Sequence, residues 1–475
     1  MAENINRKKF LRLSLLAPLG WMMSEHAAKA LSVFSKGPIN NQHVAYYKPG
    51  DPLFESLRKG FNKRIDKLPA VIALCQDTIG VSEAVKYALA NNLPVAVKSG
   101  GHCMEGFSSN NNGMVINLSA MKKIEWLSSD TIRVNPGCTL AELYNELLPK
   151  KRIIPGGSCA GVGIGGLVLG GGYGLMARRF GLTCDSLQGI TIVDGKGNIT
   201  SVSGEDELLW ACRGGNNGNF GVVTELVFKT HKAPATMQSF RFKSFKVTTE
   251  KARLILEKWF LVSETLPNNC FSAFVQNGKT TYILLTNTGS FDEKVKAAIT
   301  ELKSVTEKFT QTKPQPIASA LKVYYGQTSP LYFKNASAGL YKKFSDISNF
   351  VDKALDIVLS TPGMIYQVNT LGGKITDAVF EKNASFPHRA YPFFSELQTY
   401  WENPVQEKKL LEKFQLVQDV FNSNGIKAQY RNYPDIQFSN WPELYYGSNY
   451  ARLQEIKTKY DPDNLFRYEQ SIRIK

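Results

Sequence analysis

The sequence has few cysteines, and they do not form the pattern of a metal site. The chain of 475 residues contains seven of them, an odd number. They form neither a CxxC pair nor a ligand set interleaved with histidine, so we expect no structural zinc and no other bound metal. Their positions are Cys75, Cys103, Cys138, Cys159, Cys184, Cys212 and Cys270.

The chain also lacks a long hydrophobic run after its first thirty residues, so we expect no stable membrane insertion. Within residues 1–30, a basic stretch over 6–12 precedes an apolar stretch over 13–23, and an AxA cleavage pattern follows at 28–30. This order resembles a twin-arginine leader with Lys8 in place of the second arginine. We therefore predict an export signal over 1–30 and a periplasmic or extracellular protein. A basic amphipathic N-terminus and a retained anchor are the alternatives.

Low-complexity tracts and internal repeats are absent, and hydrophobic residues make up 43% of the chain, as in a folded globular protein. The formal net charge is +16, but the basic residues are dispersed and no nucleic-acid motif accompanies them. We therefore expect no nucleic-acid partner. The length exceeds what one hydrophobic core usually serves, so we expect two domains.

Hydrophobic periodicity predicts an α+β fold. After about residue 232 the pattern changes to aromatic-rich strands and charged helices, which indicates a second α+β domain, and a dense aromatic stretch begins at Tyr430. In the first domain we expect helical stripes over 81–89 and 140–148, the second with Thr139 as N-cap, and strands over 94–98, 114–118, 131–135, 190–193, 199–202 and 220–228. In the second domain we expect helices over 250–265 and 292–309 and a strand over 280–285.

A short glycine loop directly follows the strand expected at 94–98. Adjacent glycines let the backbone turn sharply and direct several N–H groups at an anion, so the loop can hold a pyrophosphate. An ordinary tight turn with an exposed histidine is the alternative. The loop consists of Lys98, Ser99, Gly100, Gly101 and His102.

A second segment, 155–174, holds ten glycines in twenty positions, interleaved with small apolar residues. Glycines of this kind let the chain lie against a large planar ring and its phosphates, where a side chain would collide. A flexible linker is disfavoured by the Val, Ile and Leu content, and a membrane-embedded segment by the flanks. The segment is not a Rossmann fingerprint, because no acidic residue follows on a second strand at the required distance.

Several motifs together resemble the berberine bridge enzyme-like family of FAD-linked oxidases. They are KSGGH, PGGSCAGVGIGGLVLGGGYGLMARRFGLTCDSL and LLWACRGGNNGNFGVVT in the first half. In the second half FPHR (386–389), YRNYPD (430–435) and YYGSNYARLQEIKTKYDP (445–462) follow in the family's order. The resemblance spans most of the chain after residue 30.

The resemblance implies the PCMH-type flavin fold, with a two-subdomain FAD-binding domain at 66–232 and a C-terminal segment, 428–475, that completes it. A substrate domain of antiparallel sheet and helices, 233–427, is inserted between them. It also implies a bicovalent FAD, bonded to His102 and to Cys159. The other expected FAD contacts are Val162, Gly163, Gly165, Gly166, Gly170 and Tyr433. A non-covalent pocket histidine and a small core cysteine are the alternatives for the two bonded residues.

In this family a valine at the place of Val162 accompanies reaction with oxygen, whereas a leucine hinders it. The base that takes the substrate proton is implied at Tyr430 or Glu396, with Tyr433 and Gln398 as neighbours. Tyr430 can serve as a base only if its pKa is lowered.

The resulting expectation is an FAD-dependent oxidase that takes a hydride from an alcohol carbon of a small molecule, a sugar or oligosaccharide, and reduces oxygen to hydrogen peroxide. A dehydrogenase with another electron acceptor is one alternative. A non-catalytic flavin-binding protein is the other.

Overall fold

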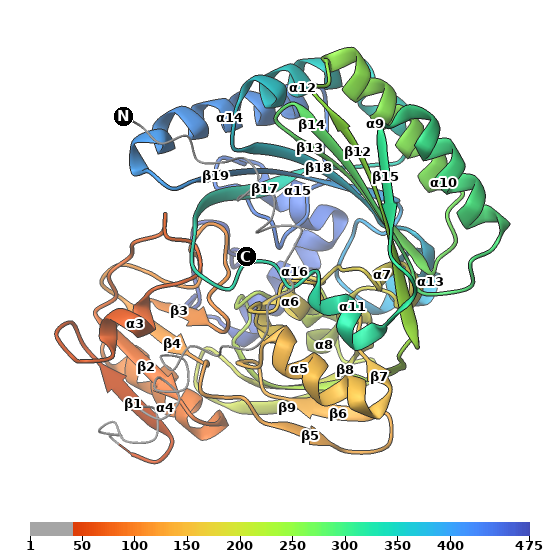
Figure 1. Cartoon of the computed structure of the whole chain (residues 1–475). Coiled ribbons are helices and arrows are strands. Elements are labelled where there is room, and N and C mark those ends of the chain that lie inside the picture. Colours follow the sequence, from red (N-terminus) through yellow and green to blue (C-terminus); the bar gives the residue numbers. More distant parts are fainter. Residues whose placement is uncertain (1–40) are drawn as a thin grey trace.

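The computed structural model describes residues 41–475 (Figure 1). The predicted export signal at 1–30 lies outside these residues. Over 41–475, none of the helices combines the length and the apolar character that a membrane span requires. Within the same range, no group of three or more His, Cys, Asp or Glu side chains is arranged to hold a metal ion.

The first subdomain is a four-stranded sheet in the order β1-β2-β4-β3. Strands β2, β4 and β3 run parallel, and β1 pairs antiparallel with β2. All five residues of β2 are buried, as expected for a parallel strand covered on both faces. The elements are β1 (Val44–Tyr47), α3 (Phe54–Arg58), β2 (Val71–Cys75), α4 (Thr78–Ala90), β3 (Val95–Lys98) and β4 (Met114–Asn117). Strand β1 precedes residue 66, where we predicted the domain to begin.

The second subdomain is a five-stranded antiparallel sheet in the order β5-β6-β10-β8-β9. The hairpin expected around 194–198 is present, since β8 and β9 pair antiparallel across it. The strands are β5 (Ile124–Trp126), β6 (Thr131–Val134), β8 (Leu187–Val193), β9 (Ile199–Ser203) and β10 (Val222–Lys229). Around them lie α5 (Leu140–Leu147), α6 (Ile164–Leu169), α7 (Ala177–Phe180), α8 (Glu207–Cys212) and the pair β7 (Arg152–Ile153) and β11 (His231–Lys232).

Helix α5 begins at the predicted cap. The Thr139 hydroxyl accepts a hydrogen bond from the Glu142 backbone N–H at 3.3 Å, and the Glu142 carboxylate accepts one from the Thr139 N–H at 2.7 Å. We expect Thr139→Ala to lower the free energy of unfolding by about 1 kcal/mol, because two N–H groups lose this reciprocal arrangement. Urea unfolding measures the change. Thr139→Ser, which keeps the oxygen, serves as the control, and equal losses in both variants would contradict the capping role.

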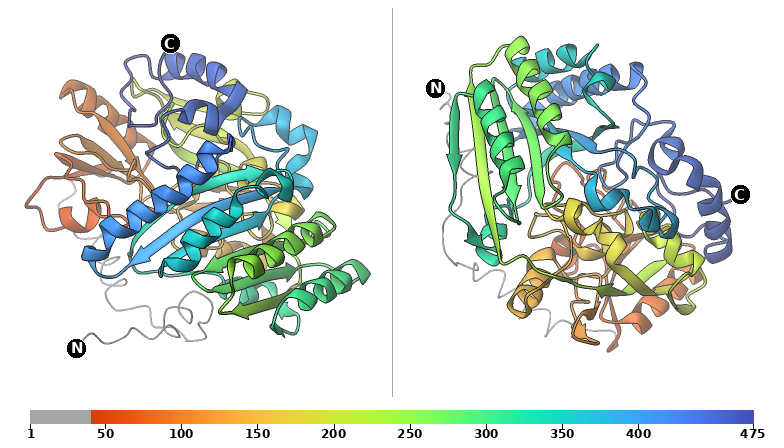
Figure 2. Two further views of the ribbon diagram at one scale, coloured as in Figure 1. Left: turned by 90° about the horizontal axis from the view of Figure 1, so that it is seen from above. Right: turned by 90° about the vertical axis from the view of Figure 1, so that its right-hand side faces the viewer.

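A large antiparallel sheet dominates the rest of the chain, in the order β15-β12-β14-β13-β18-β19-β17, with β16 also paired to β12. Helices α9, α10, α12 and α14 cover its outer face, and its inner face looks toward the first half of the chain (Figures 1 and 2). The strands are β12 (Thr236–Phe245), β13 (Cys270–Asn277), β14 (Thr280–Asn287), β15 (Lys308–Gln311), β16 (Gln315–Pro316), β17 (Tyr332–Tyr341), β18 (Met364–Thr370) and β19 (Phe393–Trp401). The helices are α9 (Thr249–Glu264), α10 (Glu293–Val305), α11 (Ile317–Lys322), α12 (Val351–Ser360), α13 (Ala378–Asn383) and α14 (Glu407–Ser423).

The predicted helix over 292–309 was too long. Helix α10 ends at Val305, because Thr306 is already extended at φ −119° and ψ 154°. Residues 308–311 form β15 instead, which pairs antiparallel with β12. The sequence of residues 308–311 is compatible with a helix or a strand, and pairing with β12 makes it a strand.

The C-terminal segment returns to the first subdomain. It contains α15 (Trp441–Tyr446) and α16 (Tyr450–Tyr460). Phe466 forms a parallel bridge with Val95 of β3. The buried Lys457 ammonium donates to the carboxylate of Asp461 at 2.5 Å and to the carbonyl of Asn219 at 2.8 Å. The segment therefore shares a core with the first half of the chain, and the division at 232 and 427 stays a proposal.

Candidate active site

The two predicted glycine segments lie against each other, backbone to backbone. A Cβ added at Gly100 would stand 2.4 Å from the backbone N of Gly163, and one added at Gly163 would stand 2.5 Å from the N of Gly100. At Gly165 a Cβ would stand 2.8 Å from the Pro136 side chain. These three glycines are therefore required by contact between chain segments, whatever else they touch.

Two polar residues of the first loop, Lys98 and Ser99, anchor it by hydrogen bonds to neighbouring backbone carbonyls. The Lys98 ammonium is buried and donates to the carbonyl oxygens of Leu57, at 2.7 Å, and Lys59. Burial lowers the pKa of Lys98 to about 8. The Ser99 hydroxyl donates to the carbonyl of Pro136, and Gly101 turns the chain at φ +70°. Lys98 and Ser99 thus fix the shape of the loop.

Two other predicted glycines differ in their surroundings. Gly166 is exposed, and a Cβ added there would meet nothing within 4 Å. At Gly170 a Cβ would stand 2.0 Å from the side-chain oxygen of Asn432. Gly166 therefore borders open space, whereas Gly170 admits an asparagine from the C-terminal segment.

His102 lies against the second glycine segment. Its ring stacks on Phe61 with centroids 4.3 Å apart and an interplanar angle of 15°. A Cβ added at Gly161 would stand 3.1 Å from His102 Nε2. Burial lowers the pKa of His102 to about 4, against a hydrogen bond with the Gly161 backbone that acts in the other direction. At neutral pH the imidazole is uncharged and keeps a nitrogen lone pair available for bonding.

Cys159, two residues before Gly161, is the only exposed cysteine of the seven. Its turn is held by the Val162 N–H, which donates to the Cys159 carbonyl at 3.2 Å. The loop after α11 lies beside it, since the Ala160 N–H donates to the carbonyl of Tyr325 at 3.0 Å. Desolvation of the sulfur by the surrounding protein raises the pKa of the Cys159 thiol, and the charge of Glu396 adds to this effect.

Glu396 is buried on the inner face of strand β19. Its two carboxylate oxygens accept hydrogen bonds from the side-chain amides of Asn335 at 3.0 Å and Asn369 at 3.2 Å. Burial raises the pKa of Glu396, and the hydrogen bonds from the amides act against this increase. The same carboxylate raises the pKa of Tyr433, after the larger effect of burial. Glu396 therefore lies close enough to Cys159 and Tyr433 to interact electrostatically with both.

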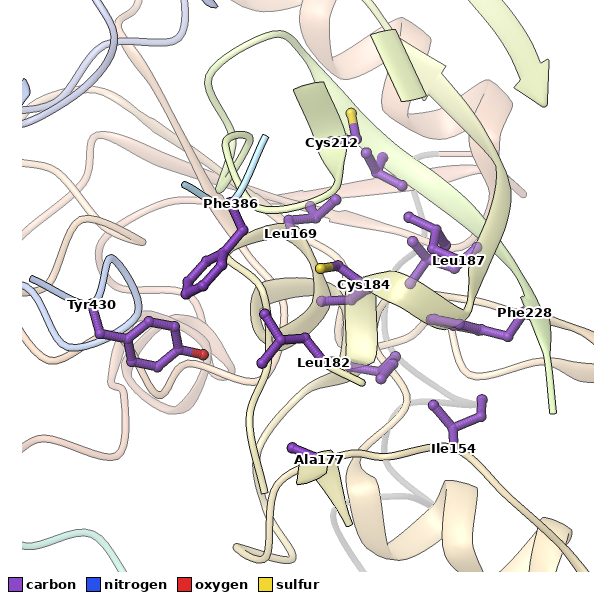
Figure 3. Close-up of a cluster of buried hydrophobic side chains, with 14 of the residues drawn as sticks. Ile154, Leu169, Ala177, Leu182, Cys184, Leu187, Cys212, Phe228, Phe386 and Tyr430 are labelled. Carbon is purple, nitrogen blue, oxygen red and sulfur yellow. The ribbon is translucent and has the colours of Figure 1, made fainter. Parts of the chain in front are cut away.

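Tyr430 and Tyr433 have different surroundings. The buried Tyr430 ring enters a cluster of apolar side chains that includes Phe386 and Leu182 (Figure 3). The Tyr430 hydroxyl accepts hydrogen bonds from the Gly172 N–H at 3.0 Å and from the Asn432 side-chain amide at 3.1 Å. Burial raises the pKa of Tyr430 to about 12. A tyrosine base requires a lowered pKa, and burial shifts the pKa of Tyr430 in the other direction.

Tyr433 is partly exposed, and its ring stacks on Phe394 with centroids 5.5 Å apart. Because alternate residues of a strand share a face, Phe394, Glu396 and the sequence neighbour Gln398 all face inward from β19. Gln398 also accepts a hydrogen bond from the Tyr400 hydroxyl at 2.8 Å.

Sequence reasoning missed four residues of this region. Asn335 and Asn369 hold the carboxylate of Glu396. Burial raises the pKa of Tyr173 and Tyr400, and both lie close enough to Glu396 for its charge to add to this increase. The alternation on β19 could have identified Tyr400, and the glycine segment contains Tyr173. Asn335 and Asn369 carry no local signal, because their strands meet β19 only in the folded sheet.

The region fits an FAD as the resemblance implies. Gly166 leaves open space beside the glycine segment, the His102 imidazole is uncharged at neutral pH, and Cys159 is exposed. Residues 98–102 and 159–166 would hold the cofactor, with the inner face of β19 opposite for a substrate.

Comparison with known proteins supports the same cofactor. A family model for an FAD binding domain matches residues 69–203, and a model described as berberine and berberine like matches residues 429–473. An FAD-linked oxidoreductase of Bacillus subtilis (strain 168), YvdP, is 32% identical over 444 residues, covering 89% of this chain and 96% of the relative. A chitooligosaccharide oxidase of Gibberella zeae is 28% identical over 444 residues and covers 87% and 89% of the two chains.

Solved structures agree over nearly the whole described chain. A chitooligosaccharide oxidase superimposes with a TM-score of 0.82 at 26% identity, covering 91% of this chain and 97% of the other. A glycopeptide hexose oxidase gives a TM-score of 0.82 at 26% identity, with 90% and 99% covered. The α+β fold is thus that of PCMH-type FAD-binding oxidases, and this chain belongs to the berberine bridge enzyme-like family of FAD-linked oxidoreductases.

Proposed function

We propose that this protein is an FAD-dependent oxidase that converts an alcohol carbon of a sugar or oligosaccharide into a carbonyl and reduces oxygen to hydrogen peroxide. The observation that carries the proposal is the buried Glu396 carboxylate, which has a raised pKa and lies close enough to Cys159 of the glycine segment for its charge to raise the pKa of that thiol. A carboxylate of this kind takes a proton more readily than an exposed one.

In this mechanism Glu396 removes the proton of the substrate hydroxyl. Asn335 and Asn369 hold the carboxylate in place with one hydrogen bond each, which limits its rotation. Bound FAD supplies the hydride acceptor for the adjacent carbon. Tyr433 lies beside Glu396. The Tyr430 hydroxyl accepts a hydrogen bond from the Gly172 N–H, so Tyr430 positions the glycine segment.

Two observations support a sugar as the substrate. The inner face of the sheet around Glu396 is polar, with Asn335, Gln367, Asn369, Gln398 and Tyr400, and such groups suit a ligand with several hydroxyls. In addition, a chitooligosaccharide oxidase and a glycopeptide hexose oxidase are among the similar proteins.

The experiment that tests the proposal is an anaerobic panel of neutral tetrasaccharides, monosaccharides and aromatic alcohols, monitored by loss of flavin absorbance. We expect a tetrasaccharide to bleach the flavin and admission of oxygen to release one equivalent of peroxide. Bleaching by an aromatic alcohol alone would overturn the sugar assignment. Failure of every compound to bleach the flavin would favour a non-catalytic flavin-binding protein.

Val162 provides a test of oxygen as the acceptor. We expect Val162→Leu to slow reoxidation of the reduced flavin by oxygen roughly tenfold, equivalent to about 1.4 kcal/mol of barrier, while anaerobic flavin reduction stays unchanged. Stopped-flow absorbance measures both steps. Slow reoxidation already in the wild type, together with rapid reoxidation by a quinone, would instead indicate a dehydrogenase.

We also propose that the FAD is bonded to His102 and Cys159, and that residues 1–30 direct export of the protein. The uncharged imidazole and the exposed thiol support the first proposal. The basic and apolar stretches of the sequence support the second.

A further inference from the structure

A straight row of side chains crosses the inner face of the large sheet from Glu396 to its far edge. Each member lies directly opposite the next on the neighbouring strand. Directly paired residues project to the same face of a sheet. In order, the row is Glu396 on β19, Gln367 on β18, Val275 on β13, Tyr282 on β14, Lys243 on β12 and Lys308 on β15. With strands about 4.8 Å apart, four steps place Lys243 roughly 19 Å from Glu396.

The far end of this row is strongly basic. Lys243 and Lys308 are direct cross-strand partners. Arg241 lies two residues before Lys243 on β12 and therefore on the same face of the strand. The Lys243 ammonium lies 5.0 Å from the centre of the Tyr282 ring. Burial lowers the pKa of Lys243, and the nearby charges of Arg241 and Lys308 lower it further.

Lys243 and Lys308 place like charges directly opposite each other on neighbouring strands. Like charges directly opposite each other in an antiparallel pair repel. Over residues 41–475, neither Lys243 nor Lys308 forms an ion pair with an acidic side chain. An anion bound between them would remove the repulsion. Between Glu396 and this end of the row, Gln367 offers an amide that suits a carbohydrate hydroxyl, whereas the Tyr282 ring is buried and packs against the Lys243 ammonium.

We propose that Lys243 and Lys308, with Arg241, bind an anionic group on the substrate several sugar units from the carbon that is oxidised. The substrate class is therefore an acidic oligosaccharide, such as one that carries a terminal uronic acid. This inference rests on the proposed sugar oxidation. The negative charge of Glu396 at the other end of the row would orient such a substrate with its neutral end at the site of reaction.

The test compares tetrasaccharides in matched pairs. Cello-, chito-, malto- and galactotetraose are each assayed as the neutral compound and with one uronic acid at the non-reducing end. The variant is Lys243→Gln with Lys308→Gln, and the control is Lys294→Gln, an exposed lysine on α10, which covers the opposite face of the sheet. Readouts are kcat/KM at low and high salt and calorimetric binding.

For the tetrasaccharide that the wild type oxidises best, we expect the acidic form to have a kcat/KM about tenfold higher than the neutral form. This advantage should disappear in the double variant and at high salt. The neutral form and the Lys294→Gln control should not change. Equal kcat/KM for both forms, or an advantage that survives the double variant, would overturn the inference and leave sugar oxidation intact.

Calorimetry separates this result from failure of the proposed function. If no sugar bleaches the flavin, binding of an acidic tetrasaccharide that the double variant loses would still support the cationic end of the row, and only the oxidation would be refuted. Absence of both bleaching and binding would refute both proposals.

Discussion

Replacing Glu396 with glutamine is expected to lower kcat for sugar oxidation by roughly 10²–10⁴-fold, the range that a general base typically contributes. The amide keeps nearly the same shape but cannot take a proton from the substrate hydroxyl. Anaerobic stopped-flow reduction of the flavin measures the step directly. The flavin spectrum and its covalent attachment should remain those of the wild type, because the FAD contacts lie on the glycine segments.

The pH dependence provides a second readout of the same residue. Because burial raises the pKa of Glu396, the carboxylate should become protonated, and inactive as a base, at a pH above the ordinary carboxyl value of 4.5. In the wild type, kcat/KM should therefore rise with pH through this raised pKa, and the rise should be absent from the residual activity of Glu396→Gln.

Glu301→Gln, a substitution of an exposed carboxylate on α10, is the matched control and should change neither rate nor pH profile. Retention of more than about a tenth of the wild-type rate by Glu396→Gln would exclude Glu396 as the base. In that case Tyr430→Phe becomes the decisive variant. If Glu396 is the base, Tyr430→Phe should perturb KM and flavin binding more than the pH profile, because its hydroxyl holds the Gly172 N–H.

Changing both His102 and Cys159 to alanine is expected to abolish covalent attachment of the flavin. After acid precipitation, the yellow colour should stay with the protein pellet in the wild type and in each single variant. In the double variant it should move completely to the supernatant. Mass spectrometry should show one FAD added to the wild-type chain and none to the double variant.

Cys103→Ala is the matched control, because Cys103 follows His102 directly and is the only other cysteine that is not buried. It should behave as the wild type. Release of colour from the wild type would refute both bonds, while loss of colour in one single variant would leave one bond, to the residue changed. The single variants should also shift the flavin reduction potential, since each bond alters the electronic character of the ring.

Local patterns in the sequence predicted much of the first domain. Thr139 forms the expected capping box, the helix expected over 81–89 is α4, and the hairpin expected around 194–198 joins β8 and β9. These features depend on caps, turns and periodicity within a few residues. The helix predicted over 292–309 extended into 308–309, but residues 308–311 form a strand because β12 lies beside them, and β12 is more than sixty residues earlier in the chain.

The sequence by itself determined the family and predicted the two glycine segments, His102, Cys159 and Glu396 as site residues, because each is carried by a contiguous motif or by its position relative to one. Only the tertiary structure decided what surrounds them. Asn335 and Asn369 reach Glu396 because β17, β18 and β19 pair in one sheet, and Lys243 and Lys308 face each other because β12 and β15 do. Such contacts arise from pairing between distant strands, which a local pattern does not encode.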